Sequence, residues 1–82
     1  MHIRITLNAA LADETIRRRP GDLFLECARQ INTPIAHRLI RATERMATCD
    51  ADNVQELYAA TDELCGAEDE FPAQHGNTEV RL

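Results

Sequence analysis

The side chains of this sequence with the clearest binding chemistry are its arginines. All nine cationic residues are Arg, and there is no Lys. Three of them, Arg38, Arg41 and Arg45, recur at i, i+3 and i+7, a spacing that places them on one face of a helix. A guanidinium binds phosphate or carboxylate through two parallel hydrogen bonds, which an ammonium cannot do. The pattern predicts an anion-binding face; a GC-rich genome explains the missing Lys without any ligand.

Acidic residues are concentrated in the other half of the chain. Residues 1–45 carry a balance of +3, whereas residues 46–80 carry −9 and contain no Lys or Arg. The arginine face could therefore pair with acids of the same chain or bind an external anion, with Arg4, Arg38, Arg41 and Arg45 as the candidates. Clustered carboxylates either keep a small protein in solution or occupy a basic groove on a partner protein. The candidate partner-binding acids are Glu56, Asp62, Glu63, Glu68, Asp69 and Glu70.

Residue types that support catalysis or metal binding are sparse. The chain has no Ser, and its three Gly are too scattered to form a phosphate-binding loop. Cys27 and Cys65 fall on apolar helical stripes, where a thiol usually serves as a small hydrophobic side chain. No two potential zinc ligands have the close spacing of a structural site; these are His2, Cys27, His37, Cys49, Cys65 and His75. We expect no enzyme activity, no cofactor and no metal.

The length and composition are those of one small domain, residues 1–82. Its core is rich in Ala, which leaves open a monomer, a homodimer or a chain stabilised by a partner. No apolar run has the roughly 18–20 residues that a membrane span needs. The N-terminus does not resemble a secretory signal, and three irregularly spaced Cys favour a reducing compartment, so we expect the cytoplasm.

The first half of the chain predicts a strand followed by helices. Residues 2–7 alternate polar and apolar side chains, which is typical of a half-buried strand. Asn8 can cap a short helix over residues 9–18, and the alternative is a hairpin with a second strand over residues 15–19. Pro20-Gly21 ends either one. A helix then begins at Asp22, and Thr33-Pro34 starts another that runs to about Ala47.

The second half predicts one helix, an exposed loop and a final strand. Asp52 begins a capping box, and an apolar stripe follows with helical spacing, made of Val54, Leu57, Tyr58, Thr61, Leu64 and Cys65. Gly66 is in place to end this helix, and residues 67–77 are acidic with Pro72 and Gly76, as in an exposed loop. Residues 78–82 alternate again and can pair with the first strand. We therefore predict a mainly helical α+β domain, with three or four helices and a two-stranded sheet formed by the chain ends.

Two functions follow, both of them binding functions. The first is a protein that inhibits or regulates a partner protein through its acidic surface; small inhibitors encoded by phages, such as anti-CRISPR and anti-restriction proteins, are similar in size and composition. The second is a DNA-binding repressor or antitoxin. Ile3-Arg4-Ile5-Thr6-Leu7 resembles the reading strand of ribbon-helix-helix proteins, and Leu39-Ile40-Arg41-Ala42 resembles their second helix. That resemblance would send His2, Arg4 and Thr6 into the major groove, although residues 9–20 have no counterpart in the family.

Overall fold

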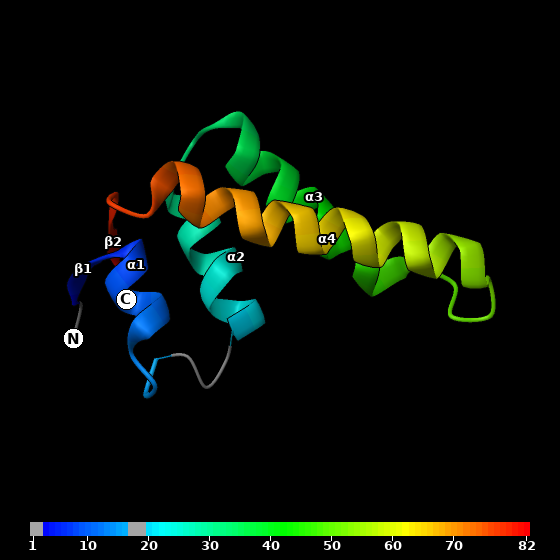
Figure 1. Cartoon of the computed structure of the whole chain (residues 1–82), viewed down its shortest axis with the longest axis horizontal. Helices are drawn as coiled ribbons and strands as arrows, with labels where there is room; N and C mark the ends of the chain where they lie inside the picture. Colours follow the sequence, from blue (N-terminus) through cyan, green and yellow to red (C-terminus); the bar gives the residue numbers. More distant parts are fainter. Residues whose placement is uncertain (1–2, 17–19) are drawn as a thin grey trace.

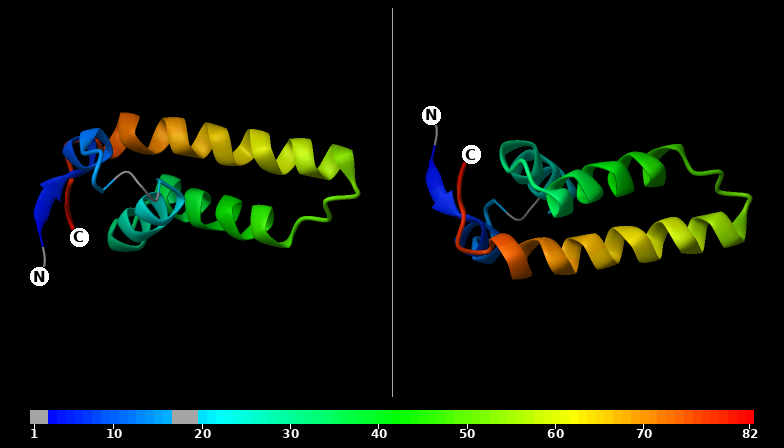
Figure 2. Two further views of the ribbon diagram at one scale, coloured as in Figure 1. Left: turned by 90° about the horizontal axis from the view of Figure 1, so that it is seen from below. Right: turned by 90° about the horizontal axis from the view of Figure 1, so that it is seen from above.

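The computed structural model describes residues 3–16 and 20–82 (Figure 1). Its elements, in chain order, are β1 (Arg4–Thr6), α1 (Leu7–Ala12), α2 (Pro20–Gln30), α3 (Pro34–Thr48), α4 (Val54–His75) and β2 (Glu79–Arg81). Helices α3 and α4 form a long antiparallel hairpin, and the sheet, α1 and α2 gather at one end of it (Figure 2). The predicted mainly helical α+β fold is confirmed.

The two chain ends pair as the alternating sequence predicts. β1 and β2 are antiparallel, with Arg4 opposite Arg81, Ile5 opposite Val80 and Thr6 opposite Glu79. Val80 is only 1% exposed, so the inward side of the sheet covers the core while the charged side chains face outward. A two-stranded sheet is marginal alone, and here the helices beneath it supply the missing contacts.

Helix α1 begins earlier than the sequence suggested. Thr6 is its N-cap and accepts a hydrogen bond from the Ala9 backbone N–H at 3.2 Å. Asn8, the expected cap, lies inside the helix and donates its backbone N–H to the Gly76 carbonyl at 2.9 Å. The helix ends at Ala12, and residues 14–16 form a turn rather than a further helical turn. Residues 17–19, on which the choice between helix and hairpin partly depended, lie outside the described residues.

Helices α2 and α3 follow their apolar patterns closely. On α2 the buried side is Leu23, Cys27 and Ala28, continued by Ile31 just after the helix. α3 begins at Pro34 as predicted and buries Ile35, Ala36, Leu39 and Ala42. The hydroxyl of Thr33 does not cap α3; it contacts Nε2 of His75 at 2.9 Å and so joins the start of α3 to the end of α4.

The end predicted for the fourth helix is wrong. α4 continues from Val54 to His75 as a single helix of 22 residues, so residues 67–75 are helical and not an exposed loop. Gly66 has no positive φ and does not act as a C′ residue, and Pro72 lies inside the helix. Burial explains the difference: Ala67 and Phe71 are both 0% exposed, and packing of these residues outweighs the local preference to stop.

The face that α4 turns to the core also differs from the prediction. Its buried residues, Ala60, Ala67 and Phe71, lie to one side of the expected stripe. Leu57, Thr61 and Leu64 are half-buried, whereas Val54, Tyr58 and Cys65 are exposed. Small alanines at the contact let α3 and α4 approach closely, and Phe71 fills the space between α4 and Phe24 on α2, with ring centroids 6.4 Å apart.

Substituting Gly66 tests the continuity of α4. We expect Gly66→Ala to stabilise the protein by about 1 kcal/mol, because Ala has the higher helix propensity. The new Cβ would meet only the Arg38 Nη2 atom, at 3.6 Å. A thermal melt should show a midpoint higher by about 4–8 °C.

Gly76→Ala is the matched control for this substitution. A Cβ at Gly76 would overlap the side-chain amide of Asn8, which must turn away, so the midpoint of this variant should rise less than that of Gly66→Ala. A lower midpoint for Gly66→Ala would contradict the uninterrupted helix, since Ala is disfavoured where φ is positive.

Candidate functional site

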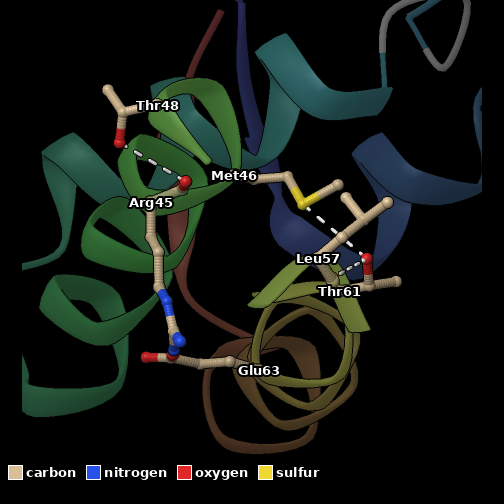
Figure 3. A network of polar contacts seen from close by, with 6 residues as sticks. All are labelled: Arg45, Met46, Thr48, Leu57, Thr61 and Glu63. Carbon is tan, nitrogen blue, oxygen red and sulfur yellow. Dashed lines mark hydrogen bonds and ion pairs between the residues drawn. The ribbon is translucent and has the colours of Figure 1, made fainter. Parts of the chain in front are cut away.

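Two of the three arginines on the predicted basic face are paired within the chain. Arg38 Nη1 lies 2.7 Å from Glu70 Oε2, and Arg45 Nη1 lies 2.6 Å from Glu63 Oε2. Both pairs join α3 to α4, and they match because the partners are seven residues apart on each antiparallel helix. Figure 3 shows Arg45 extending from α3 to Glu63, while Met46 on α3 faces Thr61 of α4. The side chains are 34–45% exposed, so each pair contributes at most about 1 kcal/mol.

The two remaining candidate arginines, Arg41 and Arg4, form no ion pair between α3 and α4 among the described residues. Arg41 lies on the outer face of α3, where it lines a shallow hollow of about 350 Å³ with His37, Ile40 and Glu44. Within residues 3–16 and 20–82, no ion pair involves Arg41. Arg4 lies on β1, with its Nε 4.0 Å from Glu79 Oε1 and both side chains about two-thirds exposed. Of the four arginines proposed to bind an anion, Arg4 thus lies on the sheet and three lie on one side of α3, where two are already paired with carboxylates.

The six candidate acids also differ in their ion pairing and in their exposure. Glu63 and Glu70 face α3 and are neutralised there. Glu56 lies half-buried in the first turn of α4, where its backbone N–H is capped by the Asn53 side chain at 3.2 Å. Glu68 is half-buried too, and burial, aided by the charge of Asp69, raises its pKa above the ordinary value. Only Asp62 and Asp69 are both exposed and without an ion pair among the described residues.

The exposed acids share one side of α4 with apolar residues. Val54, Tyr58, Asp62, Cys65 and Asp69 recur at intervals of three or four residues, which keeps them on one side of a helix. Val54 is 56% exposed and Tyr58 is 68% exposed. We call these five residues the outward face of α4. A surface Val and Tyr followed along the helix by two carboxylates combines an apolar anchor with a negative rim on one side of it.

The position of this face in the fold makes it accessible. The half of α4 that carries Val54 and Tyr58 packs against α3 and projects away from the sheet, α1 and α2 (Figure 2). The molecule measures 40 × 25 × 18 Å, and the α3–α4 hairpin lies along the longest dimension. A partner can therefore approach the outward face of α4 without contacting the sheet.

The sequence assigned Tyr58 and Val54 to the core and so missed them as surface residues. The alternative stripe Ala60, Leu64, Ala67 and Phe71 has the same helical spacing and runs past Gly66. Its alanines carry a weak hydropathic signal, which explains why the larger side chains on the neighbouring stripe dominated the pattern. The signal that would have found the right face is the continuation of the Ala stripe to Phe71.

The cysteines occupy three different environments. Cys27 is buried, Cys49 is intermediate and Cys65 is exposed, which corrects the prediction that Cys65 lies on a buried stripe. Burial, with a smaller contribution from Glu26, raises the pKa of the Cys27 thiol to about 11. This thiol stays protonated at neutral pH and serves as core packing.

In the described part of the chain, no three His, Cys, Asp or Glu side chains come together as a metal site; His2 lies outside it. None of the described helices is both long enough and apolar enough to span a membrane. Comparison with protein-family models, curated proteins and solved structures found no match.

Proposed function

We propose that this chain is a non-catalytic binding protein that inhibits or regulates a partner protein by docking the outward face of α4. The observation that supports this most strongly is the distribution of charge on α4. Glu63 and Glu70 are neutralised by α3, whereas Asp62 and Asp69 remain unpaired among the described residues and follow the exposed Tyr58 on the same side of α4. The unpaired acids and the exposed apolar side chains thus lie on the same side of α4.

The chemistry of this face indicates the kind of partner. Tyr is enriched at the centres of protein interfaces because it buries a large ring and keeps a hydroxyl for hydrogen bonding. A single helix presenting such a stripe fits a groove with an apolar floor. Asp62 and Asp69 would pair with Arg or Lys side chains at the rim of that groove. A cytoplasmic inhibitor from a phage or mobile element, occupying a basic groove of its target, would have these properties.

DNA binding through the arginines is the weaker proposal. Arg38 and Arg45 already have carboxylate partners, which reduces the positive charge that this face offers to phosphate. Arg41 alone would neutralise few phosphates, and affinity for DNA grows with the number of phosphates neutralised. The acidic α4 lies directly beside this face and repels a phosphate backbone.

Reversing the two outward charges tests the proposal. We expect Asp62→Lys with Asp69→Lys to abolish capture of a stoichiometric protein partner from lysate of the source cells. The reason is that the negative rim would become positive and repel a basic groove. Capture by the tagged protein is measured with and without nuclease.

A matched variant separates this effect from a change in net charge. Glu14→Lys with Glu26→Lys changes the charge by the same amount at exposed positions away from α4, and it should retain the partner. Loss of the partner after nuclease treatment, or equal capture by both double variants, would contradict the proposal. Recovery of DNA that depends on Arg41 would favour the DNA-binding alternative.

A further inference from the structure

The two-stranded sheet has one edge covered and one edge open. Gln30 on α2 binds the backbone of Arg81 at both groups: its side-chain nitrogen donates to the Arg81 carbonyl at 2.6 Å, and its side-chain oxygen accepts from the Arg81 N–H at 2.8 Å. The amide of Gln30 thus takes the place that a neighbouring strand would occupy on β2. Figure 2 shows β2 between β1 and α2, with β1 outermost.

The hydrogen-bond pattern places the backbone of Arg4 on the open edge. Ile3 and Leu82 exchange two hydrogen bonds, of 2.8 and 2.9 Å, which makes them a hydrogen-bonded pair. In an antiparallel ladder such pairs alternate, so the N–H and C=O groups of Arg4 and Arg81 point away from each other. Arg81 is satisfied by Gln30, whereas the Arg4 backbone has no partner in the described part of the chain.

The side chains on this sheet carry an electrostatic conflict that an added strand could relieve. Arg4 and Arg81 are directly opposite and point to the same exposed side of the sheet. Like charges at such positions destabilise a strand pair. Glu79 offsets this only weakly, since its carboxylate is 4.0 Å from Arg4 and both groups are well solvated.

We propose that the open edge of β1 binds an extended segment of a partner protein as a third strand, with a carboxylate side chain next to Arg4. The backbone of Arg4 would supply the hydrogen bonds, and Arg4 and Arg81 would supply the preference for an acidic residue. Exposed Ile3, at 51%, adds apolar contact at the same edge. A second copy of this chain fits less well, because antiparallel pairing through Arg4 would place two more guanidiniums in the same row.

This site is separate from the outward face of α4, so each proposal can fail alone. The test uses the whole ¹⁵N-labelled chain and two blocked pentapeptides, Val-Glu-Val-Glu-Val and Val-Lys-Val-Lys-Val. We expect the glutamate peptide to bind about tenfold more tightly than the lysine peptide at low salt, a preference that shrinks as salt is added. Amide exchange at Arg4 and Thr6 should slow on binding of the glutamate peptide.

Charge reversal at Arg4 sharpens the experiment. Arg4→Glu should reverse the preference between the two peptides, whereas Arg41→Glu, the same change on α3, should leave it unaltered. Equal binding of both peptides, or no slowing of exchange at Arg4, would overturn the proposal. Concentration-dependent protection of the Arg4 amide without peptide, accompanied by a dimer in sedimentation, would also overturn it and assign the edge to a second copy.

Discussion

Phe71→Ala is expected to remove a large fraction of the free energy of unfolding of the protein. Phe71 is 0% exposed and packs against Phe24 on α2 and His75 on its own helix, with ring centroids 6.4 and 5.7 Å away. Truncating a buried Phe to Ala costs about 3–5 kcal/mol. A domain of this size has a total stability of only about 4–12 kcal/mol, so the loss is a large fraction of it.

Urea unfolding followed by far-UV circular dichroism measures this effect. Phe71→Leu is the matched variant: it keeps most of the apolar volume and should cost clearly less than the alanine substitution. If residues 67–77 were an exposed loop, both variants would behave like the wild type within about 0.5 kcal/mol. That outcome would contradict the continuous, buried α4.

Tyr58→Ala is expected to weaken partner binding by at least about 30-fold while leaving the fold intact. Tyr58 is 68% exposed in the free chain, so little packing is lost when the ring is removed. An aromatic anchor at the centre of an interface is worth about 2 kcal/mol or more, which corresponds to this change in affinity. Titration of the captured partner against each variant gives the ratio.

Two further variants show whether the ring itself is responsible. Tyr58→Phe keeps the apolar area and should retain most of the affinity. Arg29→Ala, at an exposed position on α2, should bind like the wild type. If Tyr58→Ala binds normally and melts normally, the outward face of α4 is not the interface.

Local sequence patterns predicted an element correctly where the residues they placed inward are also the ones that the fold buries. The alternation of residues 2–7 and 78–82 predicted the pairing of the chain ends, and Thr33-Pro34 marked the start of α3. These elements have short-range causes, namely side-chain alternation on a strand and a fixed φ at the first helical position.

The length of α4 could not be predicted because its cause is long-range. Gly66 and Pro72 both favour a helix end locally, yet Ala67 and Phe71 gain more by packing against other elements. Arg38 and Arg45 then meet Glu70 and Glu63 only if the helix continues in register with α3. The periodicity of each helix does not give the register between the two helices, so pairing within the chain could be stated only as one of two alternatives.

The candidate site could be predicted only in part, again because it depends on contacts between two helices. The acidic character of the second half was evident, but which acids are neutralised depends on the packing of α3 against α4. The prediction left open whether the arginine face pairs within the chain; Arg38 and Arg45 do so, and Arg41 does not among the described residues. Tyr58 was assigned to the core because its large side chain gave a stronger apolar signal than the Ala stripe that α4 buries.

Site-specific photo-crosslinking tests the proposed interface most directly. A photoreactive phenylalanine analogue is placed at position 58 in one preparation and at position 29, on α2, in another, and each is irradiated in nuclease-treated lysate of the source cells. We predict one discrete protein adduct from position 58, suppressed by excess wild-type chain but not by the Asp62→Lys, Asp69→Lys variant. An adduct from position 29 with none from position 58, or one that both competitors suppress equally, would contradict the assignment of the outward face of α4 as the binding surface.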